Sequence, residues 1–275
     1  MNIITRILTV CGMLVLAVLG SGVAASDSKY MLTDNYGGKW VDAEKSPTNN
    51  QDNNMCWAAA ASNVLDWTGW GHVDGLSNTD ALFGYYQNHW EDAGSLPVFA
   101  WEWFFEGVNS SQSWSGWAKV DVAGGGFYKS EDYWSQYYDN MTGKGWDTAG
   151  AMSAVDRYLR AGYGTTMEVY SATVSHAVTV WGFNYNPDAS GDYKGVWITD
   201  SDDKKNLSSP TDDLVYYEIK YNTNKWYLQN YYGYNDIYIG GVQALAIRPV
   251  PEPATLLGFG LPILMIGLGK LRRNR

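Results

Sequence analysis

The stretch SHAVTVWGFNYNPDASGDYKGVWITDSDD, residues 175–203, predicts a β-hairpin. Residues 177–185 and 194–199 are rich in β-branched and aromatic side chains, and the turn-forming sequence NPDASGD separates them. If the turn centres on Ala189, antiparallel pairing places each residue i opposite residue 378 − i. The stretch therefore fixes both a local fold and a pairing register.

That register gives one histidine a carboxylate neighbour. His176 opens the hairpin and faces position 202 under the predicted pairing. Because side chains alternate with a period of two along a strand, Asp200 and Asp202 would flank His176 on one face. Such a carboxylate would orient the imidazole and favour its charged form.

Helical patterns dominate the first half of the chain and strand patterns the second half. An alanine-rich segment at 55–67 follows Asp52, Asn53 and Asn54, residue types that are all favoured at helix N-caps. This order predicts an α+β fold with a single body and a mainly antiparallel sheet. The other expected helices are 78–90, 97–107, 130–140 and 148–161, and the expected strands are 165–170, 177–185, 194–199, 214–220, 225–229 and 242–248.

Both ends of the chain have the pattern of targeting segments. Residues 1–25 combine Arg6, an apolar run and small residues before an expected cleavage site near Ala25, which is typical of a secretory signal. Residues 250–275 combine a Pro-Glu-Pro triplet, an apolar run at 254–269 and a basic tail. We therefore expect an exported body at 26–249, held at the inner membrane as a precursor through 254–269.

The C-terminal arrangement closely resembles the PEP-CTERM sorting signal. The resemblance implies a Gram-negative bacterium, processing by an exosortase, delivery to the cell surface or medium, and an association with exopolysaccharide. An ordinary C-terminal membrane anchor is the alternative.

Charge and aromatic content restrict the partners. The net charge of −10 argues against a nucleic-acid partner. The chain has 14 Trp and 21 Tyr, which fit either a core built from large rings or a sugar-binding surface. A non-catalytic module that binds exopolysaccharide through aromatic faces therefore stays open as an alternative function.

Cys56 is the only cysteine of the expected mature body, because Cys11 lies in the signal segment. An unpaired cysteine in an exported protein is either a small buried hydrophobic residue or a nucleophile. The first turn of a helix favours the thiolate, since the positive end of the helix dipole lowers the thiol pKa. A nucleophile also needs a base, and His176 suits that role, whereas His72 and His89 fit surface or packing positions.

Several segments resemble the IdeS/Mac family, the secreted streptococcal IgG-degrading cysteine endopeptidases. The resemblance runs from about residue 39 to 249 and is carried by KWVDAEK, NNMCWAAAASNVLDW, AMSAVDRYLRAGYGTTMEVYSATVSHAVTVWG and VWITDSDD. It implies a papain-like fold and cleavage of a protein or peptide substrate without a cofactor. It also implies Cys56 as nucleophile, His176 as general base and acid, Asp200 as the orienting residue and Asp202 as a supporting carboxylate.

The resemblance further implies an oxyanion donor upstream of the nucleophile. The family places a lysine after a Trp-x-Asp pattern, and WVDAEK puts Lys45 there, although its spacing to Cys56 is one residue longer than in the family. Gln51 is the alternative, because papain-like enzymes use a glutamine a few residues before the cysteine.

Two features of the sequence lead to no firm assignment. The acidic runs DSDD and SSPTDD offer oxygen ligands for calcium, but their spacing lacks an EF-hand pattern, and we expect no metal. The Trp- and Gly-rich segment 110–128 has no assigned role. The sequence leaves the substrate open, and we expect another exported or matrix protein rather than an antibody.

Overall fold

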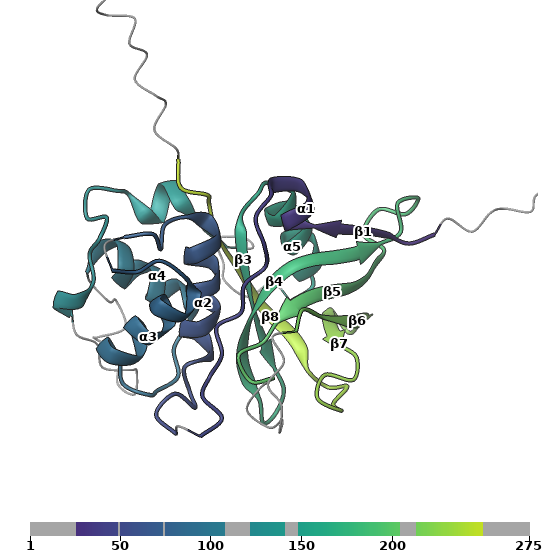
Figure 1. The fold of residues 1–275 in the computed structure, drawn as a ribbon. Coiled ribbons are helices and arrows are strands. Elements are labelled where there is room, and N and C mark those ends of the chain that lie inside the picture. Colours follow the sequence, from purple (N-terminus) through teal and green to yellow (C-terminus); the bar gives the residue numbers. More distant parts are fainter. Residues whose placement is uncertain are drawn as a thin grey trace, which may run out of the picture.

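A helical part and a sheet part lie side by side in the computed structural model (Figure 1). The structure describes residues 26–48, 50–73, 75–107, 122–140, 148–203 and 213–249. The helices are α1 (Leu32–Tyr36), α2 (Cys56–Thr68), α3 (Thr79–His89), α4 (Pro97–Glu106) and α5 (Ala151–Arg160), with a 3₁₀ turn at Val122–Gly124 and a π-helical turn at Tyr133–Tyr137.

The strands all pair antiparallel, which confirms the mixed fold with an antiparallel sheet. They follow the order β1-β4-β3-β8-β7-β6-β5, and β5 also pairs with β4, so six of the strands close into a barrel. Strand β2 adds to β8. The strands are β1 (Ser28–Met31), β2 (Tyr138–Asn140), β3 (Gly164–Tyr170), β4 (Ser175–Tyr185), β5 (Tyr193–Thr199), β6 (Val215–Asn222), β7 (Lys225–Leu228) and β8 (Tyr238–Leu245).

The hairpin of β4 and β5 has the predicted register at its open end. Thr179 pairs with Thr199 and Val180 with Ile198, which satisfies the 378 − i rule. An irregularity after Val180 then shifts the pairing by one residue toward the turn. The predicted register therefore holds at Thr179 and Val180 only. The ladder with β5 ends at Thr199 and residues 201–203 form a turn, so the predicted pairing of His176 with position 202 does not form.

Helix α2 packs between helices α3 and α4 on one side and the barrel on the other, whereas α1 and α5 lie against the barrel strands. The run of alanines at its start, Ala58 to Ala61, is buried, and small side chains allow the helix to approach β3 and β4 closely. The helix ends at Gly69, whose φ of 80° places it in the left-handed conformation typical of a helix C-terminus.

Two local predictions were wrong. Met55 is the N-cap of α2 and no side chain caps the helix, so none of Asp52, Asn53 and Asn54 has that role. The Asp52 carboxylate instead accepts hydrogen bonds from the backbone of Ser46 and the side chain of Gln87. The expected helix at 130–140 is a π-helical turn followed by β2, because pairing with β8 takes the backbone out of the helix.

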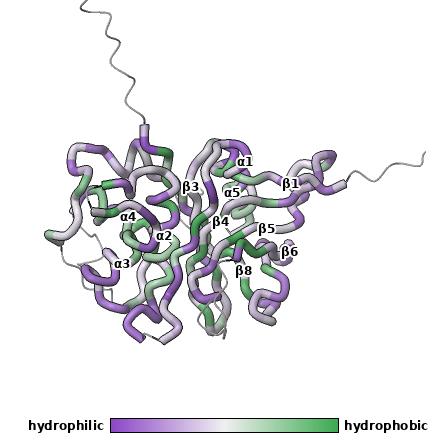
Figure 2. The backbone as a smooth tube through the Cα atoms, viewed as in Figure 1, coloured by the Kyte–Doolittle hydropathy of each residue, from purple (hydrophilic) through white to green (hydrophobic). Residues whose placement is uncertain are grey.

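Most of the described tryptophans lie in the interior. Figure 2 shows hydrophobic stretches along the central strands around β3, β4 and β8, with mainly hydrophilic outer loops. Among the tryptophans that the structure describes, only Trp134 has a strongly exposed side chain. Large rings therefore mainly fill the two cores, and the fully buried ones are Trp57, Trp101, Trp103 and Trp181.

Within the described ranges, no helix has both the length and the apolar character needed to cross a membrane. The predicted signal segment 1–25 and the predicted membrane segment 254–269 lie outside those ranges, as does most of segment 110–128.

Candidate active site

Cys56 is the first residue of α2 and lies, half-buried, in a cleft of about 490 Å³ between the helical part and the barrel. Backbone N–H groups in the first turn of a helix lack intrahelical partners and point toward such a site. The cleft is lined by residues at the start of α2, in the loop before α4, at the adjoining ends of β3 and β4, and in the connection from β7 to β8; among them are Asn53, Cys56, Leu96, Glu168, Tyr170, Val174, His176 and Tyr231.

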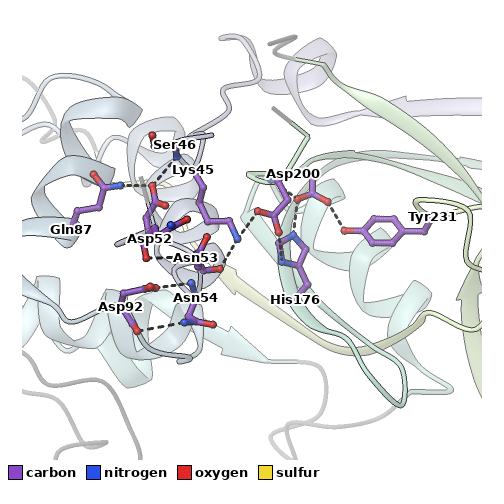
Figure 3. Close-up of polar contacts among 12 residues, drawn as sticks. Lys45, Ser46, Asp52, Asn53, Asn54, Gln87, Asp92, His176, Asp200 and Tyr231 are labelled. Carbon is purple, nitrogen blue, oxygen red and sulfur yellow. Dashed lines mark hydrogen bonds and ion pairs between the residues drawn. The ribbon is translucent and has the colours of Figure 1, made fainter. Parts of the chain in front are cut away.

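His176 lies at the start of β4 and is held by a buried carboxylate. Its Nε2 lies 2.6 Å from Oδ1 of Asp200, which directly follows β5 (Figure 3). The same carboxylate accepts hydrogen bonds from the Tyr231 hydroxyl and, at 3.0 Å, from the backbone N–H of Asp202. With Nε2 engaged, Nδ1 is the ring nitrogen through which His176 acts on another group.

The pKa of Asp200 reflects this network. Burial raises the pKa of the carboxyl, but the His176 charge, the hydrogen bonds from His176 and Tyr231, and the Asp202 N–H lower it to about 2. Asp200 is therefore ionised near neutral pH, and it presents a negative charge to the imidazole.

Cys56 and His176 shift each other's pKa toward an ion pair. Burial raises the pKa of the Cys56 thiol, yet the charge and hydrogen bond of His176, followed by the charge of Lys45, bring it below its ordinary value. Burial lowers the pKa of His176, and the charges of Asp200 and Cys56 raise it well above its ordinary value. Both shifts favour the thiolate–imidazolium ion pair over the neutral thiol and imidazole.

Lys45 reaches the site from a segment that runs beside the end of β5. Its backbone N–H donates to the carbonyl of Ser201 at 3.0 Å. Its buried Nζ donates to the carbonyl of Asn53 at 3.0 Å and lies 2.6 Å from Oδ1 of Asp202. An ammonium has three N–H groups, so these two contacts leave one for a ligand in the cleft.

The structure thus brings Lys45, and not Gln51, into the cleft. Gln51 is exposed and is absent from the lining of this pocket. Asp202 lies 3.7 Å from Nδ1 of His176 but makes its shorter contact with Lys45. The ion pair between Asp202 and Lys45 was not predicted from the sequence.

The other two histidines have the surface and packing positions that the sequence predicted. His72 is exposed and its Nε2 lies 2.8 Å from Asp66. His89 packs against the rings of Tyr85 and Trp103, with centroid distances of 4.2 and 5.8 Å.

Sequence reasoning missed Tyr231 and Glu168. Tyr231 comes from an irregular connection after β7, and one tyrosine among 21 gives no signal of its own. Glu168 gave a weak signal, because it is the single charged residue in the otherwise strand-like sequence GTTMEVY.

A second carboxyl group cluster lies beside the site. One oxygen from each of Asp42, Glu44 and Asp203 lies within 4.8 Å of the others, and these carboxyl oxygens are buried. Burial is the main cause that raises the pKa of Asp42 to about 8 and, with the Asp42 charge, that of Glu44 to about 10. Protonated carboxyls of this kind share protons with one another. The second acidic run considered as a calcium ligand, SSPTDD, lies mostly outside the described residues, at 208–212.

Comparison with known families supports the resemblance on part of the chain. Residues 126–236 match the family model described as Mac 1, which supports the IdeS/Mac family. The match includes His176, Asp200 and Asp202, whereas Lys45 and Cys56 precede it. A comparison with curated proteins finds no match.

Proposed function

We propose that this chain is an exported cysteine endopeptidase of the IdeS/Mac type, with a papain-like fold, that hydrolyses peptide bonds of a protein substrate. One observation carries the proposal: a thiol at a helix start is hydrogen-bonded to an imidazole whose far nitrogen lies 2.6 Å from a buried aspartate. A structural cysteine has no need of this arrangement, because a buried thiol is stable without a charged partner.

Acylation uses the ion pair of Cys56 and His176. The thiolate sulfur attacks the carbonyl carbon of the scissile bond and forms a tetrahedral intermediate. His176 then donates its Nδ1 proton to the leaving amine, and an acyl-enzyme forms. Asp200 keeps Nε2 protonated and directed toward itself, so that Nδ1 is the nitrogen that exchanges protons.

Deacylation reverses the proton's path. Neutral His176 takes a proton from a water molecule, whose oxygen attacks the thioester carbon. The C–S bond then breaks, which releases the product acid and restores the Cys56 thiolate beside the His176 imidazolium. The third N–H of the Lys45 ammonium and the backbone N–H of Cys56 are the donors that we assign to the oxyanion in both steps. Asp202 holds Lys45 in position for this role.

The compartment and the processing belong to the same proposal. Export through residues 1–25, inner-membrane retention through 254–269 and removal of the tail by an exosortase would deliver the enzyme to the surface or surroundings of a Gram-negative cell. A substrate in that setting is an exported or matrix protein.

A peptide-library cleavage assay tests the proposed chemistry. We expect the purified protein to cleave a subset of peptides, and Cys56→Ser and His176→Asn to lose cleavage while keeping the far-ultraviolet circular dichroism spectrum. His72→Asn is the matched control, because this exposed histidine lies outside the cleft, and it should retain full activity. Absence of cleavage together with a Cys56 that resists iodoacetamide at pH 6 would reject the endopeptidase and favour a structural thiol.

A further inference from the structure

Glu168 is a buried acid in the wall of the catalytic cleft that the proposed mechanism does not use. It pairs with Ala177 across β3 and β4, and paired residues point to the same side of a sheet. Ala177 packs in the core cluster that contains α2, so Glu168 faces the helix that carries Cys56. The Glu168 side chain is 2% exposed, and the residue lines the cleft.

The Glu168 carboxyl has no hydrogen-bond partner among the other residues that the structure describes. Within the ranges that the structure describes, neither of its side-chain oxygens has a hydrogen-bond partner, although both are buried. The pKa of this carboxyl is raised to about 8, because burial and, to a smaller extent, the charge of Cys56 outweigh the lowering effect of its own backbone N–H. Buried polar groups are nearly always satisfied, so an unsatisfied acid in a reactive cleft points to a group that arrives from outside.

The surrounding cleft suits a long apolar side chain with a polar end. Apolar and aromatic side chains line the same cleft, including Trp57, Leu96, Tyr170, Val174 and Ile237. Two cations already line the cleft. Lys45 contacts Asp202 and Asn53, and the His176 imidazolium contacts Asp200. Arginine and lysine bury an apolar stem and carry a cation at the tip, which complements such walls and a buried acid.

We propose that Glu168 is a specificity-determining residue that binds an arginine or lysine side chain of the substrate at one fixed position near the scissile bond. This inference rests on the proposed endopeptidase function. The incoming cation donates hydrogen bonds to the carboxylate and compensates its buried charge. An uncharged side chain at that position would leave the acid unpaired, so the cleft discriminates against it.

Matched peptides test the selection directly. A library identifies the preferred position, and paired substrates then carry arginine or citrulline there, which have nearly the same shape but differ in charge. We expect the wild type to prefer arginine by roughly 10- to 100-fold in kcat/KM, the range for a charged hydrogen bond. Glu168→Gln should remove this preference and retain cleavage of the citrulline peptide.

Two further variants serve as controls for this test. Glu218→Gln is the matched control, because Glu218 is exposed on β6 outside the cleft, and it should keep the preference for arginine. Glu168→Met repeats the test with a side chain of similar length that needs no hydrogen bond, in case the buried glutamine destabilises the protein. A wild type without a basic preference, or a Glu168→Gln variant that keeps one, would overturn the proposal.

A second measurement does not depend on proteolysis. Cationic 2-(trimethylammonio)ethyl methanethiosulfonate, whose charge does not depend on pH, and uncharged methyl methanethiosulfonate both react with a thiolate, which forms a mixed disulfide and releases methanesulfinate. Mass spectrometry of the Cys56 peptide gives the ratio of the two rates at pH 9, where Glu168 is mainly ionised. We expect this ratio to fall about tenfold in Glu168→Gln and to stay constant in Glu218→Gln.

The two measurements separate the two hypotheses. A ratio that does not change in Glu168→Gln overturns the cation site, whether or not peptides are cleaved. A ratio that falls while the wild type cleaves no peptide supports the cation site and rejects the endopeptidase.

Discussion

Replacing Asp200 with asparagine should raise the pKa of Cys56 and lower that of His176 without unfolding the protein. Asparagine has the same shape, and it can still accept a hydrogen bond from the Tyr231 hydroxyl. It carries no charge, and its amide can stabilise the wrong imidazole tautomer. The pH window in which thiolate and imidazolium coexist should therefore narrow from both sides.

The pKa of Asp200 sets the size of the effect. Its favourable contacts hold the pKa at about 2, against an ordinary value of 3.8, although burial acts in the opposite direction. That net shift corresponds to about 2 kcal/mol, on the order of 10- to 100-fold in an equilibrium constant. Because Tyr231 and the Asp202 N–H supply part of it, we expect Asp200→Asn to reduce both kcat/KM and the thiol alkylation rate at pH 6 by about 10- to 100-fold.

Alkylation of Cys56 by iodoacetamide across pH 5 to 10 is the assay. The wild type should react well below the pH at which ordinary thiols do, because the pKa of Cys56 is lowered. The rates of wild type and variant should converge toward pH 10, where both thiols are ionised. Asp192→Asn is the matched control, since Asp192 lies in the exposed hairpin turn beside Lys194, and its profile should match the wild type. An unchanged profile in Asp200→Asn would remove Asp200 from the catalytic group.

Three further predictions test the remaining assignments. Lys45→Met should lower kcat by about 10²-fold with a smaller effect on KM, as expected for a lost oxyanion donor. Gln51→Ala should change neither kcat nor KM, and the reverse result would assign the oxyanion donor to Gln51. Glu44→Gln should raise the Tm at pH 9 and much less at pH 5, because between the ordinary pKa and about 10 the folded wild type keeps a proton on Glu44 that the unfolded chain releases. Wild-type stability therefore falls as pH rises through that window. A lower wild-type Tm in EGTA would instead indicate calcium. Mass spectrometry of surface-released protein should find no residues after about 250, and an intact Arg275 would reject the sorting signal in favour of a plain anchor.

Local patterns predicted the elements that depend on local interactions. The alanine-rich helix appears at Cys56–Thr68, and the hairpin keeps its predicted register at Thr179 and Val180. Where a long-range contact decided the conformation, the prediction was wrong. The sequence pattern at Tyr138–Asn140 predicts a helix, but the segment pairs with β8, which begins about a hundred residues later. Period and propensity carry no information about such a partner.

The sequence by itself determined that one cysteine begins a helix and that one histidine begins a strand whose hairpin partner ends in aspartates. Those facts follow from local periodicity, turn chemistry and the alternation of strand side chains. Only the tertiary structure decided that α2 packs against β3 and β4, so that Cys56, His176 and Lys45 share one cleft. It also placed Tyr231 on the Asp200 carboxylate and buried Glu168 with no hydrogen-bond partner among the other described residues, because burial and pairing depend on segments that meet only when the chain is folded.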